Sequence, residues 1–361
     1  MSSELELPTL RPGKSIALIA LGMGVYFIYL YHLGFQEIIR ALGNVNIAIF
    51  SLGFVLALAG VLGDSLAWQE IAKKFDYNVS IWDFFLIYMS CIFMNNLIPS
   101  GSFSGETTRI YFLDKIAGNS RIDKSSATVA ATRIITAIPF IVGTLIGLVY
   151  LALATDAPAW TLATCSGITI ILFCLNLGFF GVCYAEGWLE RIIFPIVDHI
   201  ERIFRIHIDR GMASGVMNQF HESMNMLASH KRTLFISTFW AVVGWLCMTL
   251  VAAITFRSMG VSIPLRAVFA VYTVMIFLQM LPIFLPGGIG LVDIVMITLF
   301  TAIGVPTHSA VVASILIRLI QLWFLTALGG IATAYLVKKI NRDPQDPPSR
   351  SVQQKAFKCL R

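Results

Sequence analysis

Charged residues are scarce in this 361-residue chain: they make up 13% of it, against 57% hydrophobic residues. Soluble globular proteins carry about 25% charged and about 45–50% apolar residues. The shortage extends over the whole chain, so it excludes a soluble enzyme, a disordered polypeptide and a coiled coil. We therefore expect lipid to be the solvent for most of the chain.

Other chemical signatures are also missing. The six cysteines form no CxxC pair and the six histidines no HExxH spacing, so neither a disulfide framework nor a zinc site is indicated. There is no Walker loop, no GxSxG elbow and no dinucleotide fingerprint. We expect no cofactor and no metal. The net charge of +6 does not indicate a nucleic-acid partner, because Lys and Arg occupy short flanks between apolar runs.

Long apolar runs are what the chain has in abundance. About 20 apolar residues cross a hydrocarbon core of about 30 Å, and runs this long form helices rather than barrel strands. The sequence therefore predicts an all-α polytopic membrane protein with about eight transmembrane helices. The predicted spans are 15–33, 47–68, 81–98, 126–154, 160–184, 234–256, 267–285 and 310–337.

Two segments rich in glycine and proline interrupt this pattern, at 99–109 (PSGSFSGETTR) and 286–293 (PGGIGLVD). Such interruptions are typical of broken or re-entrant helices. Each segment has a glycine two residues after its proline, a carboxylate seven residues after it, and an arginine in the following apolar span. These matching positions are Gly101 and Gly288, Glu106 and Asp293, and Arg133 and Arg318. We predict an internal repeat with halves at about 81–154 and 267–337.

The distribution of Lys and Arg predicts the orientation, because short flanks rich in these residues stay in the cytoplasm. All these flanks lie in the cytoplasm only if the chain crosses the membrane once at each Gly-Pro segment. The two halves then have opposite orientations in the membrane. Shallow loops that return to the same side would instead make the halves parallel. We predict the inverted form, in a multi-pass protein of the cell membrane with both termini cytoplasmic.

The predicted domain organisation follows from this topology. Residues 1–13 are expected to form a cytoplasmic segment and residues 14–339 the membrane domain. Residues at about 186–232 are expected to form a cytoplasmic loop of amphipathic character, with either a helix that lies on the membrane surface or an ordinary helix packed under the bundle. Residues 340–361 have the composition of a disordered tail.

Ionisable residues inside a membrane cost about 2.5–3.5 kcal/mol each on insertion scales, so each one requires an explanation. Asp64 and Asp83 lie near predicted span ends and are expected to reach the interface. Glu106 and Arg109 share one helix face, and Ser104 is the expected N-cap of that helix. A carboxylate in a first helical turn is also favoured by the helix dipole alone.

The arginines in the two long spans have two compatible interpretations. Arg133 and Arg318 either form intramembrane ion pairs with the two carboxylates or belong to a transport path. Arg318 is also expected to share a polar stripe with Ser314 and Gln321.

The combination of features favours binding of an anion. A helix that begins in a Gly-rich turn exposes unpaired N–H groups, and arginine adds bidentate recognition of phosphate or carboxylate. We therefore expect a phosphorylated headgroup whose tail remains in lipid, and no catalytic residue. The predicted headgroup site consists of Asn95, Asn96, Gly101, Gly105, Glu106, Arg109, Arg133, Gly287, Gly288, Gly290, Asp293, Arg318 and Gln321.

The segments 96–113 and 285–293, with Arg318 downstream, make the chain similar to a known family. It resembles the lysylphosphatidylglycerol synthase transmembrane region, a flippase-like family of integral membrane proteins, over about residues 14–339. The chain has Ser where the family usually has Gly in the first motif, and Asp293 where Glu is common. Both changes preserve the turn and the carboxylate.

The resemblance implies a function in lipid traffic. Family members fused to an aminoacyl-transferase domain make aminoacylated phosphatidylglycerol and move it between leaflets, whereas only a short tail follows Lys339 here. We therefore expect translocation of a phosphate-bearing lipid, either a phospholipid or a polyprenyl-linked precursor, without the synthase activity. The alternatives are a membrane transferase that uses Glu106 or Asp293 as a base, and an accessory subunit that binds a lipid-modifying enzyme or glycosyltransferase.

Overall fold

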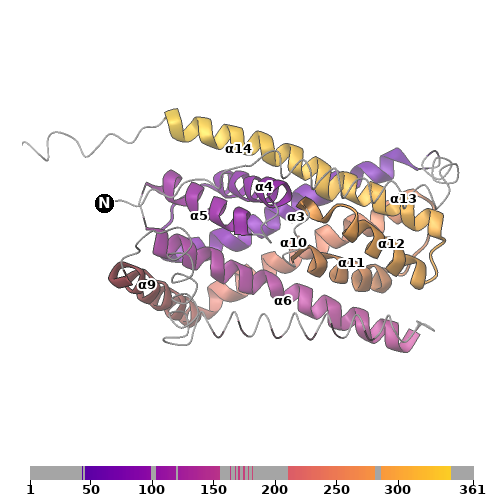
Figure 1. The fold of residues 1–361 in the computed structure, drawn as a ribbon, viewed down its shortest axis with the longest axis horizontal. Helices are drawn as coiled ribbons and strands as arrows, with labels where there is room; N and C mark the ends of the chain where they lie inside the picture. Colours follow the sequence, from indigo (N-terminus) through magenta and orange to yellow (C-terminus); the bar gives the residue numbers. More distant parts are fainter. Residues whose placement is uncertain are drawn as a thin grey trace, which may run out of the picture.

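Helices are the only regular elements in the residues that the computed structural model describes, which are 45–98, 103–118, 121–154, 210–280, 286–342 and a few single positions (Figure 1). No strand occurs in these ranges, as the all-α prediction requires. The elements are α3 (Ile47–Ala72), η1 (Lys73–Phe75), α4 (Ile81–Leu97), α5 (Phe103–Ala117), α6 (Ile122–Ala154), α9 (Arg210–Ser229), α10 (Lys231–Ser258), α11 (Leu265–Met280), η2 (Pro286–Gly288), α12 (Leu291–Ala302), α13 (Thr307–Arg318), η3 (Leu319–Phe324) and α14 (Leu325–Arg342).

Four helices of the described part are long and apolar enough to cross a membrane. They are Ile47–Phe75, Ile122–Gly147, Lys231–Ser258 and Thr307–Asn341. The predicted span at 15–33, nearly all of the one at 160–184, and the two predicted terminal segments lie outside the described residues, apart from 340–342. The predicted count of eight spans is therefore not confirmed.

Helices α3 and α10 run antiparallel and pack closely. The Asn46 amide donates to the Ser258 carbonyl (2.8 Å) at one end of the pair, and the Ser237 hydroxyl donates to the Ala67 carbonyl (2.8 Å) at the other. A Cβ atom on Gly63 would lie 2.9 Å from the Cα atom of Gly244. Small residues thus let the two backbones approach, as in many membrane helix pairs.

Helices α4 and α5 form a hairpin on either side of the first Gly-Pro segment. At its tip, the Ser104 hydroxyl donates to the Met94 carbonyl (3.1 Å). At its open end, Ser80 and Ala117 line the same groove. Helix α14 packs antiparallel along α4 and brings Lys339 to this open end, so the hairpin opens where α3 ends and α6 begins (Figure 1).

A second hairpin, formed by α11 and α12, opens at the opposite end of the molecule (Figure 1). The ring of Phe300, near the end of α12, lies 4.6 Å from the ring of Phe256, near the end of α10. At the closed end of this hairpin, η2 packs against α4. The two hairpins therefore enter the bundle from opposite ends and approach one another in its interior.

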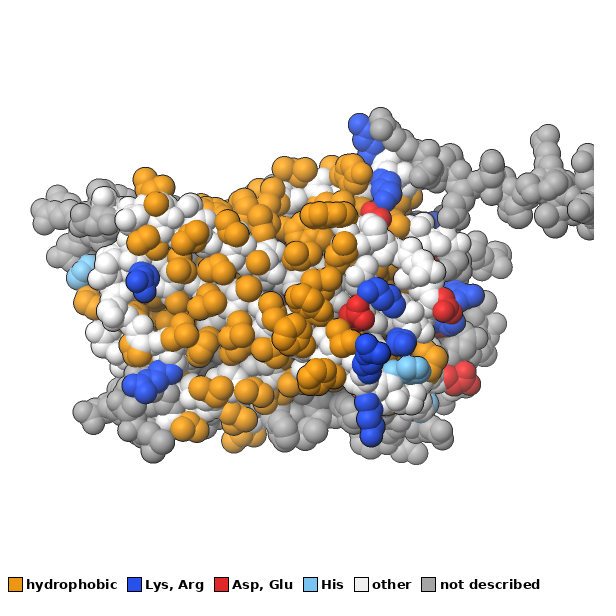
Figure 2. Space-filling model, turned by 180° about the vertical axis from the view of Figure 1, so that it is seen from behind, with side chains coloured by type: hydrophobic (Ala, Val, Ile, Leu, Met, Phe, Trp, Pro, Cys, Tyr) orange, Lys and Arg blue, Asp and Glu red, His pale blue; other side chains and the backbone are white. Residues whose placement is uncertain are grey.

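Charge is distributed unequally between the two ends. Figure 2 shows a broad hydrophobic belt with Lys and Arg gathered mainly at one end. The basic residues at the end where the first hairpin opens are Lys73, Lys74, Lys115, Arg121, Lys124, Lys231, Arg232, Lys338, Lys339 and Arg342. Arg257 and Arg266 lie at the opposite end.

Candidate functional site

Glu106 joins two arginines near the tip of the first hairpin. Its Oε2 atom lies 3.1 Å from Arg109 Nη1, and its Oε1 atom lies 3.3 Å from Arg133 Nη1 on α6. The predicted pairing of Arg133 with a carboxylate is therefore present. The Arg133 side chain is 34% exposed and that of Glu106 21%, so this pair is accessible from outside the bundle.

Arg109 is the most unusual charge in this cluster. It is 2% exposed, and its guanidinium carbon lies 4.2 Å from the Trp68 ring centroid and 5.0 Å from that of Tyr88. Its Nε and Nη2 atoms have no hydrogen-bond partner among the described residues. Buried donors without partners cost about 1–3 kcal/mol each, which the two aromatic rings offset in part. An anion that reached these two donors would satisfy them.

Asn95 organises the start of α5. Its Oδ1 atom accepts from the Gly105 amide (2.7 Å) and from the Ser104 hydroxyl (3.3 Å). The prediction of Ser104 as N-cap is wrong, because α5 begins at Phe103 and Ser104 is turned back toward α4. A Cβ atom on Gly105 would lie 2.5 Å from the Asn95 amide, so this position requires glycine.

Asn96 connects the hairpin to α14, since its Nδ2 atom donates to Thr326 Oγ1 (2.8 Å). Both predicted asparagines therefore have structural partners at the hairpin tip. Gly101 lies outside the described residues.

Asp293 and Arg318 form the second cluster, with Asp293 Oδ1 3.1 Å from Arg318 Nε. The other Asp293 oxygen accepts from the Gly290 amide (2.9 Å), and Arg318 Nη2 donates to the Gly287 carbonyl (2.6 Å). Ser314 completes the group at 3.5 Å from Asp293 Oδ1. The two charged side chains are 5% and 6% exposed, so this ion pair is enclosed by the protein.

Three glycines shape the turn that precedes Asp293. Gly287, Gly288 and Gly290 have φ values of 59°, 64° and 88°. Residues with a Cβ atom rarely adopt these angles. This turn places the Gly287 carbonyl and the Gly290 amide on opposite members of the Arg318–Asp293 pair.

A π-helical turn, η3, follows Arg318 directly. Such turns are rare overall but occur often at functional sites, and no sequence feature indicated this one. Gln321 lies in it and donates to the Met248 carbonyl of α10 (2.8 Å). Of the two residues predicted to share a polar stripe with Arg318, Ser314 lies beside the ion pair and Gln321 contacts α10.

Asp64 was expected at the membrane interface, and the structure corrects this. Helix α3 continues beyond it to Ala72, and Asp64 is partly buried against Gly244 of α10 and near Arg109. Asp83 instead lies in the first turn of α4, paired with Lys339 (2.5 Å). Sequence reasoning also missed the aromatic partners of Arg109, because apolar runs conceal such roles.

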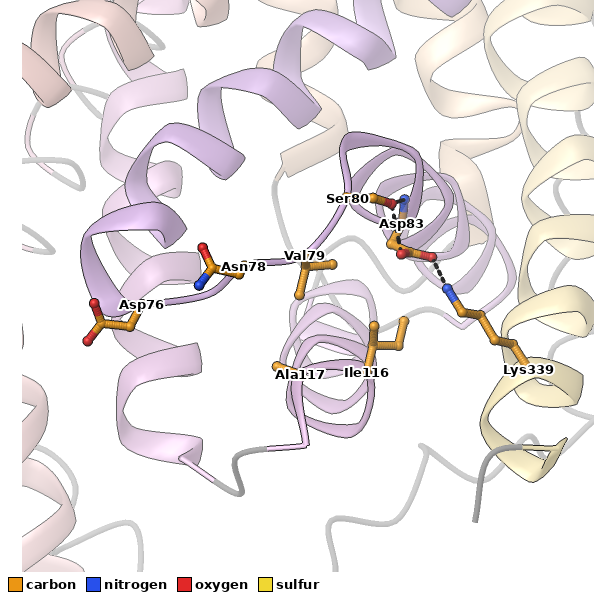
Figure 3. A pocket seen from close by; sticks show the side chains of 8 residues that line it. All are labelled: Asp76, Asn78, Val79, Ser80, Asp83, Ile116, Ala117 and Lys339. Carbon is orange, nitrogen blue, oxygen red and sulfur yellow. Dashed lines mark hydrogen bonds and ion pairs between the residues drawn. The ribbon is translucent and has the colours of Figure 1, made fainter. Parts of the chain in front are cut away.

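A groove of about 580 Å³ lies at the open end of the first hairpin (Figure 3). Figure 3 shows Asp83 and Lys339 pointing toward one another across α4 and α14. The lining residues are Asp76, Asn78, Val79, Ser80, Asp83, Ile116, Ala117 and Lys339. The groove is separate from both ion-pair clusters. Within the described ranges, no group of three His, Cys, Asp or Glu side chains is arranged to hold a metal ion.

Long apolar helices, two opposed hairpins and buried ion pairs define a polytopic membrane protein. The chain belongs to the family of the lysylphosphatidylglycerol synthase TM region, whose family model matches residues 15–329. The resemblance inferred from its motifs is thereby confirmed.

The chain is also similar along most of its length to archaeal UPF0104 membrane proteins. The relative from Pyrococcus horikoshii is 29% identical over 328 residues, which cover 88% of this chain and 96% of the relative. A relative from Methanothermobacter thermautotrophicus is 25% identical over 92% of this chain and 98% of its own length. One from Methanocaldococcus jannaschii is 25% identical, with 91% and 97% covered.

Proposed function

We propose that this protein binds a phosphate-bearing lipid, such as a phospholipid or a polyprenyl-linked precursor, and moves it between the leaflets of the membrane. The observation that carries the proposal is the accessible Glu106–Arg133 pair beside Arg109, whose buried donors are unpartnered. A phosphate has the charge and geometry to engage both guanidinium groups.

Exchange of partners at Arg133 supplies the binding step. Ion pairs near a surface contribute only about 0–1 kcal/mol, so a phosphate can replace the Glu106 carboxylate at little cost. Glu106 then retains Arg109 as its partner, 3.1 Å away, and no carboxylate is left unpaired. The acyl or prenyl tail needs no pocket, because the hydrophobic belt of Figure 2 allows it to stay in lipid.

The arrangement of the hairpins supports movement across the membrane. We infer that the two Gly-Pro segments and their flanking helices are inverted halves, since one hairpin opens at each end of the molecule. Alternating access in transporters uses such halves around a site near the midplane. Following the positive-inside rule, we assign the end rich in Lys and Arg to the cytoplasmic side of the cell membrane.

The test is lipid movement by the purified full-length protein in liposomes that contain fluorescent phosphatidylglycerol. Arg133→Gln is expected to reduce movement at least about tenfold, as the loss of one charged contact of about 1.5–3 kcal/mol requires. Arg257→Gln is the matched control. It removes an exposed arginine in the last turn of α10, outside both ion-pair clusters, and is expected to retain the wild-type rate.

Native mass spectrometry of the gently purified protein identifies the substrate class. A retained phospholipid or polyprenyl phosphate that is lost in Arg133→Gln supports the proposal. Movement at the wild-type rate in Arg133→Gln contradicts it, and a covalently altered lipid would instead support a membrane transferase.

A further inference from the structure

Asp64 differs from every other carboxylate in the helices of the bundle interior that the structure describes. Glu106 and Asp293 each pair with an arginine, whereas no basic side chain of the described residues lies within ion-pair distance of Asp64. A charged carboxylate inside a membrane is costly unless a partner or a function accounts for it.

The position of Asp64 is fixed by close packing. A Cβ atom on Gly244 would lie 2.7 Å from Asp64 Oδ1, so the carboxylate rests against the α10 backbone at a point where only glycine leaves room. Among the described residues, the titratable and charged side chains that face it are Arg109 of α5, Tyr88 and Cys91 of α4, Cys247 of α10 and Tyr272 of α11, and the Tyr88 hydroxyl donates a hydrogen bond to the carboxylate. Arg109 is the one full charge among them.

The formal charges around Arg109 depend on the proton of Asp64. Arg109 and Arg133 carry two positive charges, and Glu106 and Asp64 carry two negative charges when both are ionised. The group is then neutral. A proton on Asp64 leaves it with one net positive charge in a region of low dielectric constant, where it attracts an anion strongly.

We propose that Asp64 takes up a proton together with an anionic lipid headgroup and releases both on the other side, so that a proton gradient drives lipid movement. The inference rests on the proposed function. In the loading step, water at one face supplies the proton that forms an O–H bond on Asp64, and the headgroup phosphate binds the excess positive charge. In the release step, the proton returns to water at the other face and the group becomes neutral again.

Linkage makes this coupling quantitative. If protonation of Asp64 strengthens headgroup binding by some factor, headgroup binding strengthens protonation by the same factor. An anion that binds only the protonated form loses about tenfold in affinity for each pH unit in the range where Asp64 is ionised. The gradient response and the proton uptake must therefore disappear together when Asp64 cannot titrate.

The test uses the full-length protein in phosphatidylcholine liposomes that contain fluorescent phosphatidylglycerol, with a pH gradient imposed across the membrane. The wild type is expected to move the lipid at least about tenfold faster with the gradient than without it. Asp64→Asn holds the group at one net positive charge, so it is expected to bind the lipid with an affinity that no longer falls at higher pH and to show no acceleration by the gradient. Asp76→Asn changes an exposed Asp at a positive φ that Asn also tolerates, and it is expected to keep the full response.

A measurement on the wild type alone guards against misfolding of the variant. Calorimetric titration with phosphatidylglycerol in buffers of different ionisation enthalpy is expected to report uptake of about one proton per lipid bound. Zero uptake, or a full gradient response in Asp64→Asn, overturns the proton coupling and leaves lipid translocation standing. Absence of lipid movement in the wild type overturns both proposals.

Discussion

The two charge clusters arise from the same sequence pattern, and they differ in accessibility and in hydrogen bonding. The Glu106–Arg133 pair is 21% and 34% exposed, whereas the Asp293–Arg318 pair is 5% and 6% exposed. Arg109 retains unpartnered donors in the first cluster, whereas the Gly287 carbonyl and the Gly290 amide complete the second. A repeated motif thus specifies a carboxylate–arginine pair without specifying whether that pair is open to a ligand.

The comparison suggests different roles for the two clusters. A pair with free donors and an exposed arginine can exchange a carboxylate for a phosphate, whereas a buried pair with satisfied hydrogen bonds resists exchange. We infer that the first cluster binds the headgroup and that the second holds the Gly-rich turn against α13.

The largest expected effect comes from breaking the buried pair. Arg318→Gln leaves Asp293 charged and unpaired in the interior, which is expected to lower stability by about 3–5 kcal/mol. Arg133→Gln, the matched change in the accessible cluster, is expected to lower it by less than about 1 kcal/mol. Thermal unfolding in detergent measures both, and equal losses would contradict the distinction between the clusters.

Glycine substitutions give an intermediate effect and test why each turn needs glycine. Gly287→Ala forces a Cβ atom onto a backbone with φ of 59°, 2.7 Å from the Leu322 side chain, and is expected to cost about 1–2 kcal/mol. Gly53→Ala is the control, because Gly53 lies in a regular helix and its new Cβ atom would meet the end of the Ile320 side chain (2.6 Å) with Val251 at an ordinary contact distance (3.8 Å). Unfolding temperatures that fall equally in both variants would exclude backbone strain as the cause.

The smallest effect is expected at the surface pair outside both clusters. Lys339→Gln breaks the contact with Asp83, where the lysine side chain is 36% exposed, so stability is expected to change by about 0–1 kcal/mol. In the wild type, added salt is expected to reduce the contribution of this ion pair to stability. A loss comparable to that of Arg318→Gln, measured in the same unfolding assay, would show that exposure does not separate these ion pairs.

The sequence predicted the two carboxylate–arginine pairs, because a charged side chain inside a membrane needs a partner of opposite charge. Glu106 and Asp293 pair with Arg133 and Arg318 as expected, since an unpaired charge in such surroundings is costly. The prediction for Ser104 failed because its side chain bonds to α4, and the contact of Gln321 with α10 could not be foreseen because its partner belongs to another helix. Their orientation depends on how α4 packs on α5 and how η3 packs on α10.

Asp64 illustrates a different limit of the sequence. Its position near the end of an apolar run indicated the interface, but α3 extends beyond the run and buries it beside α10. The contacts of Trp68 and Tyr88 with Arg109 could not be predicted either, because the sequence of an apolar helix does not indicate which of its aromatic residues will contact a cation on another helix.

The sequence by itself determined the solvent, the helical class, the family and the chemistry of the two motifs, because hydropathy and residue spacing are local properties. Only the tertiary structure decided which ion pair is accessible, which arginine has donors without a partner and which carboxylate has no basic partner among the described residues. Those outcomes depend on contacts between helices far apart in the chain, such as α3 with α10 and η2 with α4.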